Sequence, residues 1–238
     1  MTDNTQDTVQ TAPSPQLQEM AEAGLLFGRK KSQTNPKMKP FICANRGGFE
    51  LFDLEKTKDM LEKAQAFIEE AAKGSKPILF VATHPASQGL VEELAKKFSY
   101  PYVTLRWLGG TLTNFDTIQT RLKYYLKLKS DQATGKLLKY TKKEQVKFSQ
   151  ELERLERLFG GLEKLDQRPA ALFVVNANLH KTAIREATQS GIPVVAIATT
   201  SADPVPIDYL IPANDSARKS ISWILDRFTE VIENAKKK

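Results

Sequence analysis

The sequence is poor in the residues that most often build catalytic and metal-binding sites. Its 238 residues include one cysteine, Cys43, and two histidines, His84 and His180. A single thiol cannot form an internal disulfide and excludes a cysteine-rich zinc site, while two histidines argue against a catalytic metal. A lone free thiol is typical of a reducing compartment such as the cytoplasm. We therefore expect neither a disulfide framework nor a metal.

Other sequence signals are missing as well. No apolar run approaches the ~18 residues that a membrane-spanning helix needs. The polar N-terminus MTDNTQDTVQTAPSPQ lacks the basic start and the apolar centre of a secretory signal. The phosphate-binding patterns GxGxxG and GxxxxGKS/T are also absent. These absences argue against membrane insertion, export and nucleotide binding of the usual kinds.

Positive charge is concentrated in two segments of the chain. Residues 25–49 carry six basic residues and no acid, and residues 121–147 carry nine basic residues against two acids. The second segment alone equals the formal net charge of the chain, +7, so the remainder is near neutral. Such clustering predicts a polyanionic partner, with nucleic acid first, and a solvated charged surface is the alternative.

Apolar runs separated by helical patterns indicate an α/β fold. The runs are PILFVAT (77–83), YVTLR (102–106), ALFVVNA (171–177), PVVAIA (193–198) and, more weakly, YLI (209–211). They are continuous rather than alternating, as is typical of parallel strands buried on both faces. Helical patterns follow them at 86–98, 180–190 and 214–233. We predict a doubly wound parallel sheet in the flavodoxin-like order 2-1-3-4-5.

The N-terminal part has its own elements. A short helix is expected from Leu17 to Phe27, ended by Gly28. The loop RKKSQTNPKMKP follows, and then FICA and FELFD flank NRGG as a predicted β-hairpin. A helix should run from about Asp53 to Lys73 and stop at Gly74.

The connection from YVTLR to ALFVVNA is far longer than a standard crossover. Two sets of apolar residues recur in it at heptad spacing, namely Phe115, Ile118, Leu122 and Tyr125, and then Phe148, Leu152, Leu155, Phe159 and Leu162. TKKE (141–144) is a capping box for the second helix. We predict a protruding antiparallel helical hairpin, a coiled coil. Its structural hinge is expected at Trp107, Gly109, Gly110, Gly160 and Gly161.

The carboxyl ends of the predicted strands, where open α/β sheets bind ligands, hold both histidines. Acid–base catalysis usually needs a tuning partner, but Asp203 is the nearest carboxylate in sequence, and Asn176 and Thr199 are neutral. We expect His84 and His180 to cap helices rather than to catalyse. A nucleotide- or sugar-phosphate-binding enzyme that uses this edge is the alternative function, and a coiled-coil adaptor that binds only proteins is a third.

The basic segments are predicted to bind RNA phosphates, while Tyr124, Tyr125 and Tyr140 could stack on bases or sugars. A soluble coiled coil with lysine-rich flanks is the alternative for the second segment. The predicted RNA-binding residues are Arg29, Lys30, Lys31, Lys37, Lys39, Arg46, Arg106, Arg121, Lys123, Lys127, Lys129, Lys136, Lys139, Lys142, Lys143 and Lys147.

Several stretches together resemble the bacterial form of small-subunit ribosomal protein two. They are FGRKKSQTNPKMKPFI, RWLGGTLTNFDTI, TKKE with ELERLERLFGG, and GIPVVAIATTSADPVPIDYLIPAND. The resemblance implies a flavodoxin-like sheet with a protruding helical hairpin, bound to ribosomal RNA of the small subunit in the cytoplasm. It also implies that the protein is no enzyme and that neighbouring proteins include the mRNA-binding ribosomal protein one, which it helps to hold.

The chain departs from that family at several positions. Arg29 and Thr34 stand where the family usually has His and Trp, and neutral Asn176, Thr199 and Val205 replace common acids. A divalent ion of the kind bound in the family is therefore not expected, nor is any cofactor.

The predicted organisation has four parts. They are a disordered tail (1–16), a sheet domain (17–110 and 161–232), a helical hairpin arm (111–160) and a basic C-terminal tail (233–238).

Overall fold

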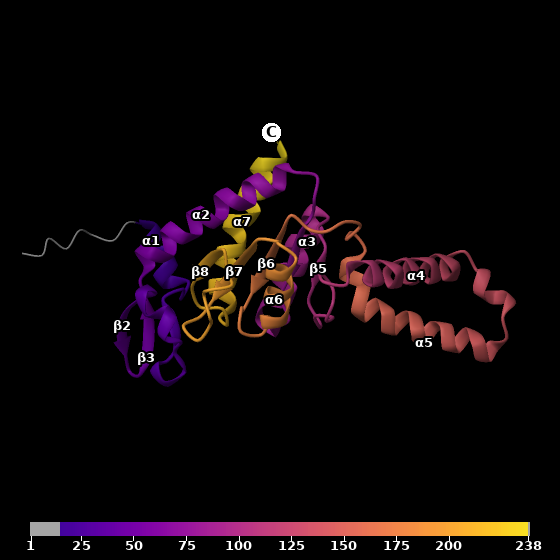
Figure 1. Cartoon of the computed structure of the whole chain (residues 1–238), viewed down its shortest axis with the longest axis horizontal. Helices are drawn as coiled ribbons and strands as arrows, with labels where there is room; N and C mark the ends of the chain where they lie inside the picture. The colour runs from indigo at the N-terminus through magenta and orange to yellow at the C-terminus, as the bar shows by residue number, and fades with distance from the viewer. Residues whose placement is uncertain (1–14, 238) are drawn as a thin grey trace, which may run out of the picture.

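The computed structural model describes residues 15–237, and its centre is a five-stranded parallel sheet (Figure 1). The strands are β5 (Tyr102–Val103), β4 (Ile78–Val81), β6 (Ala171–Val175), β7 (Val194–Ala198) and β8 (Tyr209–Pro212), in that spatial order. Each neighbouring pair is parallel. Numbered along the chain, this order is 2-1-3-4-5, so the predicted doubly wound arrangement is confirmed. Most strands are shorter than the apolar runs, and β5 is shortened most in proportion, to two residues of YVTLR.

The continuous apolar runs are explained by burial of the strands on both faces. Every residue of β4, β6 and β7 is buried. On one face Phe80 and Phe173 pack at 5.2 Å between ring centroids, and Phe173 meets Phe228 at 4.9 Å. On the other face Leu172 and Val174 join a second apolar cluster. Hydrophobic burial from both sides therefore fixes the sheet.

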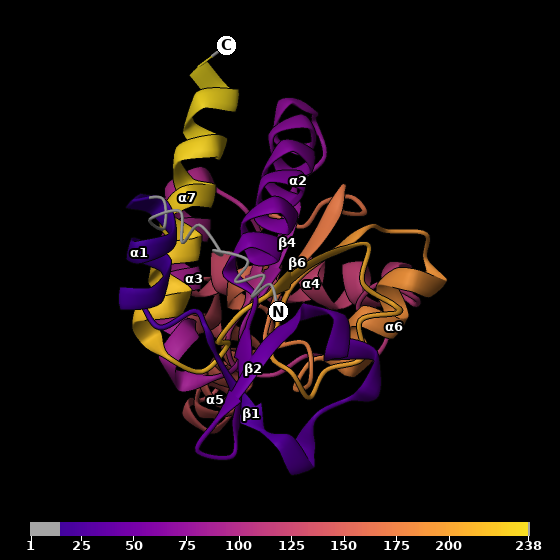
Figure 2. The same cartoon turned by 90° about the vertical axis from the view of Figure 1, so that its left-hand side faces the viewer.

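Helices cover both faces, as doubly wound folds require. One face carries α1 (Pro15–Glu22), α2 (Leu54–Lys73), α3 (Pro85–Phe98) and α7 (Arg218–Lys237). Figure 2 shows α2 and α7 rising side by side. The other face carries α6 (Lys181–Gln189). Asp53 caps α2 by accepting the backbone N–H of Glu55, and Gly74 follows its end, as predicted.

A second, antiparallel sheet lies beside the β8 edge (Figure 1). It contains β1 (Phe27–Lys30), β3 (Phe49–Phe52) and β2 (Ile42–Arg46), with two short 3-10 helices, η1 (Lys31–Gln33) and η2 (Pro36–Phe41), between β1 and β2. The predicted hairpin of β2 and β3 is confirmed.

The expected helix from Leu17 to Phe27 is wrong at its C-terminal end. The helix stops at Glu22, and Gly24 turns the chain with a φ of +79°. Gly28 lies within β1 instead of ending a helix. A Cβ there would come within 2.4 Å of Thr200 Cγ2 and 2.9 Å of the Glu50 carbonyl, so this glycine permits close approach of β1 to the central sheet.

The long connection between β5 and β6 forms two helices, α4 (Phe115–Ala133) and α5 (Lys142–Phe159), joined by η3 (Lys136–Lys139). They lie side by side and extend away from the β5 edge (Figure 1). The predicted apolar positions of both helices are buried, except Phe148, which is partly exposed. The carboxylate of Glu144 accepts the Thr141 N–H at 3.0 Å, as the capping box predicts.

The predicted chain ends are only partly comparable with the structure. Pro15 and Gln16 begin α1, and the rest of the expected tail, 1–14, lies outside the described residues. The last helix continues through Lys237 rather than ending before a basic tail, and Lys238 is not described.

The second glycine pair offers a test of packing beside β5. A Cβ on Gly161 would lie 2.2 Å from the Tyr102 carbonyl oxygen, whereas one on Gly160 would meet nothing closer than Glu156 Cγ at 3.6 Å. Gly161→Ala should lower the free energy of unfolding by roughly 1–3 kcal/mol because backbone atoms must move. Gly160→Ala is the matched control, since Gly160 already has helical φ and ψ; it should be neutral or stabilising by about 0.4–1 kcal/mol. Urea unfolding measures both, and equal stabilities would contradict this packing.

Candidate nucleic-acid interface

Every cation predicted to bind RNA is solvent-exposed in the structure. Exposure alone does not make a cation available, because several of them already have a protein partner. The structure therefore divides the predicted set into cations engaged within the protein and cations without an ion pair among the described residues.

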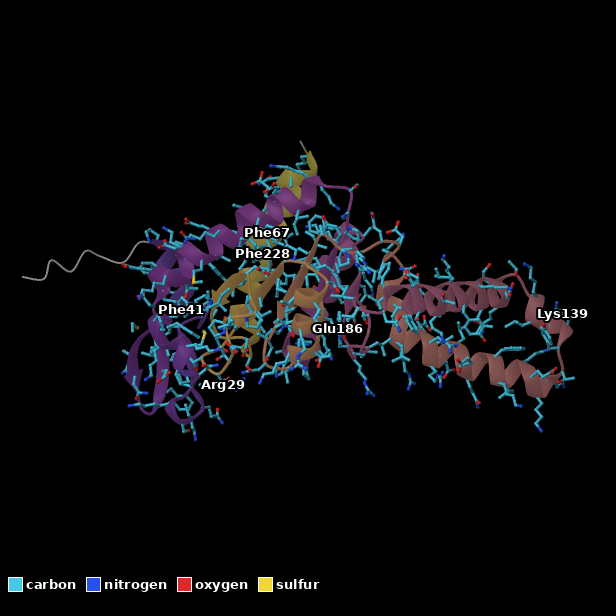
Figure 3. All side chains as sticks on the ribbon, viewed as in Figure 1. Arg29, Phe41, Phe67, Lys139, Glu186 and Phe228 are labelled. Atoms are coloured by element: carbon cyan, nitrogen blue, oxygen red, sulfur yellow. The ribbon has the colours of Figure 1, made fainter. Side chains whose placement is uncertain are left out.

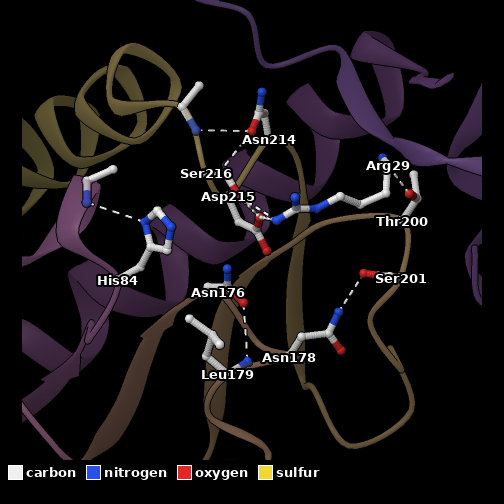
Figure 4. Close-up of polar contacts among 12 residues, drawn as sticks. Arg29, His84, Asn176, Asn178, Leu179, Thr200, Ser201, Asn214, Asp215 and Ser216 are labelled. Carbon is white, nitrogen blue, oxygen red and sulfur yellow. Dashed lines mark hydrogen bonds and ion pairs between the residues drawn. The ribbon is translucent and has the colours of Figure 1, made fainter. Parts of the chain in front are cut away.

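Arg29 is engaged with the carboxyl edge of the central sheet (Figure 4). Its guanidinium donates to Ser216 Oγ at 2.6 Å and lies 3.6 Å from Asp215 Oδ1. Its backbone N–H donates to Thr200 Oγ1 at 2.9 Å. Because Asp215 is only 1% exposed, the guanidinium compensates a carboxylate that water cannot reach.

Burial dominates the chemistry of Asp215. It raises the pKa of this carboxyl above its ordinary value, while the hydrogen bond from Ser216 and the charge of Arg29 act in the opposite direction. Arg29 and Ser216 therefore offset part of the cost of burying this carboxyl in its ionised form.

The loop after β1 is fastened to the same edge. The Asn35 N–H donates to the Thr200 carbonyl at 2.9 Å. Lys37 pairs with Asp203 at 3.1 Å. The hydrogen bond from the Val205 N–H, followed by this pair, holds the pKa of Asp203 below its ordinary value. The remaining cations of the segment, Lys30, Lys31, Lys39 and Arg46, have no ion pair within the described part of the chain.

Both histidines have structural roles at the carboxyl ends. His84 Nδ1 accepts the Ala86 N–H at 3.3 Å and caps α3, as predicted. His180 does not cap a helix through its side chain. Its Nε2 accepts the Thr83 N–H at 3.2 Å and its Nδ1 lies 2.9 Å from the Asn176 carbonyl, while burial lowers its pKa. Both ring nitrogens are thus used to join β4 to β6.

The residues at this edge do not fit a divalent cation. Asn176 uses its side-chain oxygen to accept the Leu179 N–H, and Val205 is an exposed apolar side chain. Asp215, the buried carboxylate, already faces a guanidinium. Within residues 15–237, no group of three or more His, Cys, Asp or Glu side chains could hold a metal.

On α4, η3 and α5, two of the predicted cations are engaged. Lys129 pairs with Glu163 at 2.6 Å, and Lys136 pairs with Asp131 at 3.5 Å. The remaining ones have no ion pair with another described residue, namely Arg121, Lys123, Lys127, Lys139, Lys142, Lys143 and Lys147. Figure 3 shows Lys139 at the end of the helix pair far from the sheet.

One of the predicted stacking tyrosines is wrong. Tyr125 is fully buried, and its hydroxyl donates to Glu163 at 2.9 Å. Burial, followed by that carboxylate, raises the pKa of Tyr125 to about 12. Tyr125 lies in the apolar seam, which we define as the buried heptad residues between α4 and α5. It therefore cannot stack on a nucleobase. Tyr124 and Tyr140 are exposed, and Lys139 lies over the Tyr140 ring.

The segment that leads into α4 is held by a residue that the sequence analysis missed. The Glu186 carboxylate on α6 accepts the Trp107 indole N–H at 3.0 Å and the backbone N–H groups of Gly110 at 2.9 Å and Leu112 at 3.1 Å. The available signal was a glutamate on the apolar side of KTAIREATQ, three residues after Ala183 and next to Ala187.

The returning chain is held as well. The side chain of Gln119 on α4 donates to the Leu165 carbonyl. Glu163, just after η4 (Gly160–Leu162), accepts from Tyr125 and Lys129. Arg106 is exposed, and no ion pair with a described residue is found for it.

Comparison with known proteins gives one consistent family. The family model described as "Ribosomal protein S2" matches residues 20–235. A "Small ribosomal subunit protein uS2" from Coprothermobacter proteolyticus is 43% identical over 216 residues, which cover 91% of this chain and 81% of that protein. Proteins of the same name are 41% identical in Roseiflexus sp. (90% of this chain, 82% of that protein) and in Thermus thermophilus (92% and 86%). Among the described residues no helix meets the length and apolarity of a membrane span.

The Arg29–Asp215 pair predicts a pH-dependent loss of stability. Removing the cation in Arg29→Met should cost about 2–3 kcal/mol near neutral pH, below the range for fully buried pairs because Arg29 is 44% exposed. The folded pKa of Asp215 is already above the unfolded value and should rise further. The penalty should therefore vanish below the unfolded pKa of about 3.9 and appear as pH rises through the folded pKa.

Urea unfolding across the acidic to neutral range measures this dependence. Lys37→Met is the matched control, because the Lys37–Asp203 pair is exposed on both sides and should cost less than ~1 kcal/mol. A deficit in Arg29→Met that stayed constant with pH would show that Asp215 is not the group affected.

Proposed function

Because the chain belongs to the ribosomal protein S2 family, which is a structural, non-enzymatic component of the small ribosomal subunit, we propose that it binds ribosomal RNA through two basic surfaces. As a ribosomal protein it acts in translation, and its place is on bacterial ribosomes in the cytoplasm. The first surface is the arm, which we define as residues 111–160. The second is the N-terminal surface formed by Lys30, Lys31, Lys39 and Arg46.

The arm carries the proposal. We propose that α4 and α5 form an antiparallel coiled-coil hairpin that projects from the sheet domain (17–110 and 161–232). The support is that each helix has two different faces. The apolar seam residues are buried, whereas Lys123, Lys127 and Lys143 are exposed to solvent. Cations without an internal carboxylate partner can approach phosphates without first breaking an ion pair.

The seven cations of the arm without an ion pair, named above, are its proposed phosphate contacts. Lys129 and Lys136 contribute less, because each already compensates a carboxylate. Tyr124 and Tyr140 are the proposed stacking residues. Arg106, exposed beside the start of the arm, is proposed to reach a neighbouring phosphate.

The N-terminal surface lies at the opposite end of the molecule from the arm, as Arg29 and Lys139 mark in Figure 3. The two surfaces are therefore proposed to contact separate parts of the folded RNA. Arg29 and Lys37 are proposed to act indirectly, because their charges are used to fasten the loop to Asp215 and Asp203.

We also propose contacts with neighbouring small-subunit proteins, including ribosomal protein one. The support is apolar exposure on the three-stranded sheet, where Phe27 and Phe49 are 51% and 45% exposed. Phosphate contacts would not cover such rings, whereas a protein neighbour would. The choice of ribosomal protein one rests on the family alone.

The electrostatic role of the arm predicts a steep response to salt. With about six phosphate contacts from the arm and a log–log slope of roughly −0.9 per contact, the arm alone should account for about a thousandfold fall in affinity for ribosomal RNA between 50 and 200 mM salt. Replacing six unpaired cations by Gln should make that slope shallower by roughly five, while the exposed positions keep helix propensity and fold. The six are Arg121, Lys123, Lys127, Lys142, Lys143 and Lys147.

A matched control separates the arm from general positive charge. The same number of exposed sheet-domain cations without an ion pair to another described residue is changed to Gln, namely Lys63, Lys76, Arg168, Arg185, Arg218 and Lys219. Filter binding at several salt concentrations, with circular dichroism to verify folding, should show a shallower slope only for the arm variant. Equal slopes in the two variants, or a flat response in the wild type, would overturn the proposed role of the arm.

A further inference from the structure

We propose that Glu186 fixes the direction in which the arm leaves the sheet, so that the glycine-rich segment leading into the arm is a rigid root rather than a hinge. The root is defined as residues 107–112. The proposal rests on the proposed function only for its consequence in RNA binding. The fixed orientation of the root is itself a property of the free protein.

The contacts of Glu186 are concentrated on this root. Glu186 is only 6% exposed. Its two carboxylate oxygens accept hydrogen bonds from three N–H groups, those of the Trp107 indole and of the Gly110 and Leu112 backbone. Hydrogen bonds to a charged acceptor are among the strong ones, and burial strengthens them further. Without Glu186, the buried Leu112 N–H would be left unsatisfied.

The glycine conformation belongs to this arrangement. Gly110 has a φ of +89°, a conformation that turns its N–H toward Glu186 and that a residue with a Cβ rarely adopts. Thr111 and Leu112, directly after it, are fully buried. A flexible joint would instead leave this segment solvated, with its backbone groups bonded to water.

The helix that carries Glu186, α6, is packed against the central sheet. Ala183, Ile184 and Ala187 of the same helix are buried in the apolar cluster that also contains Leu172 and Val174 of β6. Figure 3 places Glu186 between the sheet and the start of the helix pair. The carboxylate therefore transmits the position of the sheet directly to the first residues of the arm.

A fixed root matters because the arm is a lever. At about 1.5 Å per residue, the 19 residues of α4 extend about 28 Å from the root. A tilt of about 10° there would move the far end by roughly 5 Å, more than the ~3 Å that an N–H···O hydrogen bond to a phosphate spans. Loosening the root would thus put the terminal lysines out of register with the phosphates that they are proposed to contact.

The test removes the charge and one acceptor. In Glu186→Gln the side chain keeps one oxygen, which can serve either the Trp107 and Gly110 donors or Leu112, but not both sides. Hydrogen exchange of the Gly110 and Leu112 amides in the free protein should accelerate by roughly 5- to 150-fold, the factor that corresponds to an unsatisfied buried N–H. Trp107→Phe, which removes a single donor, should show a smaller acceleration and covers the case in which Glu186→Gln fails to fold.

Two further measurements connect exchange to the direction of the arm. Spin labels at Glu93→Cys on α3 and Gln132→Cys near the end of α4, in a Cys43→Ser background, report the distance from body to arm. Glu186→Gln should broaden this distance distribution, whereas Glu153→Gln, an exposed change of the same charge on α5, should leave it narrow. Affinity for ribosomal RNA should fall with an unchanged salt slope, because the contacts remain and only the competent population shrinks.

The outcomes separate this proposal from the proposed function. Unchanged exchange at Gly110 and Leu112, with an unchanged distance distribution in Glu186→Gln, would overturn the fixed root whatever the protein binds. A loosened root with no loss of RNA affinity would leave Glu186 in its structural place and would contradict its role in positioning the arm for RNA.

Discussion

We propose that the buried carboxylate of Glu186, which accepts three N–H groups, fixes the direction of the arm, where residues 121–147 have a charge balance equal to the +7 of the whole chain. The arm concentrates cations without a carboxylate partner, but it can present them in a defined place only if its root is fixed to the sheet. Glu186 provides that attachment on the outgoing chain. On the returning chain, Gly161 lets the backbone lie against Tyr102, and Glu163 ties α4 to the end of the arm through Tyr125 and Lys129. The seam of the arm also belongs to the same apolar cluster as Leu172 and α6.

The carboxylates decide which cations are available to a partner. Arg29 compensates the buried Asp215, and Lys37 meets Asp203, so both hold the N-terminal loop against the carboxyl ends of the strands. That edge is where other doubly wound proteins bind ligands. In this protein the N-terminal segment packs against that edge. Both ring nitrogens of His180 form hydrogen bonds with backbone groups there. The same edge thus serves to fasten two sheets together, in keeping with a non-enzymatic family.

Much of the fold could be predicted from the sequence because its signals are local and periodic. Continuous apolar runs identified the strands, heptad spacing identified α4 and α5, and TKKE located the start of α5. The errors share a different cause. The roles of Gly28, Tyr125 and Glu186 are set by contacts with residues far away in the chain. Gly110 and Glu186, for example, are separated by 76 positions in the sequence. No local pattern distinguishes a glycine that ends a helix from one, such as Gly28, that lets Thr200 pack against its backbone. Nor does any local pattern distinguish an exposed tyrosine that could stack on a nucleobase from one, such as Tyr125, that is buried between two helices.

The central claim is that the arm, held at a fixed root, is a main contact of this protein with ribosomal RNA. The most direct measurement is a cryo-electron microscopy map of small subunits that contain this chain. The account predicts RNA phosphates beside Lys127, Lys142 and Lys143, a separate RNA element near Lys31 and Arg46, and Trp107 still directed at Glu186. An arm surrounded by solvent or only by protein, with RNA confined to the sheet domain, would contradict it.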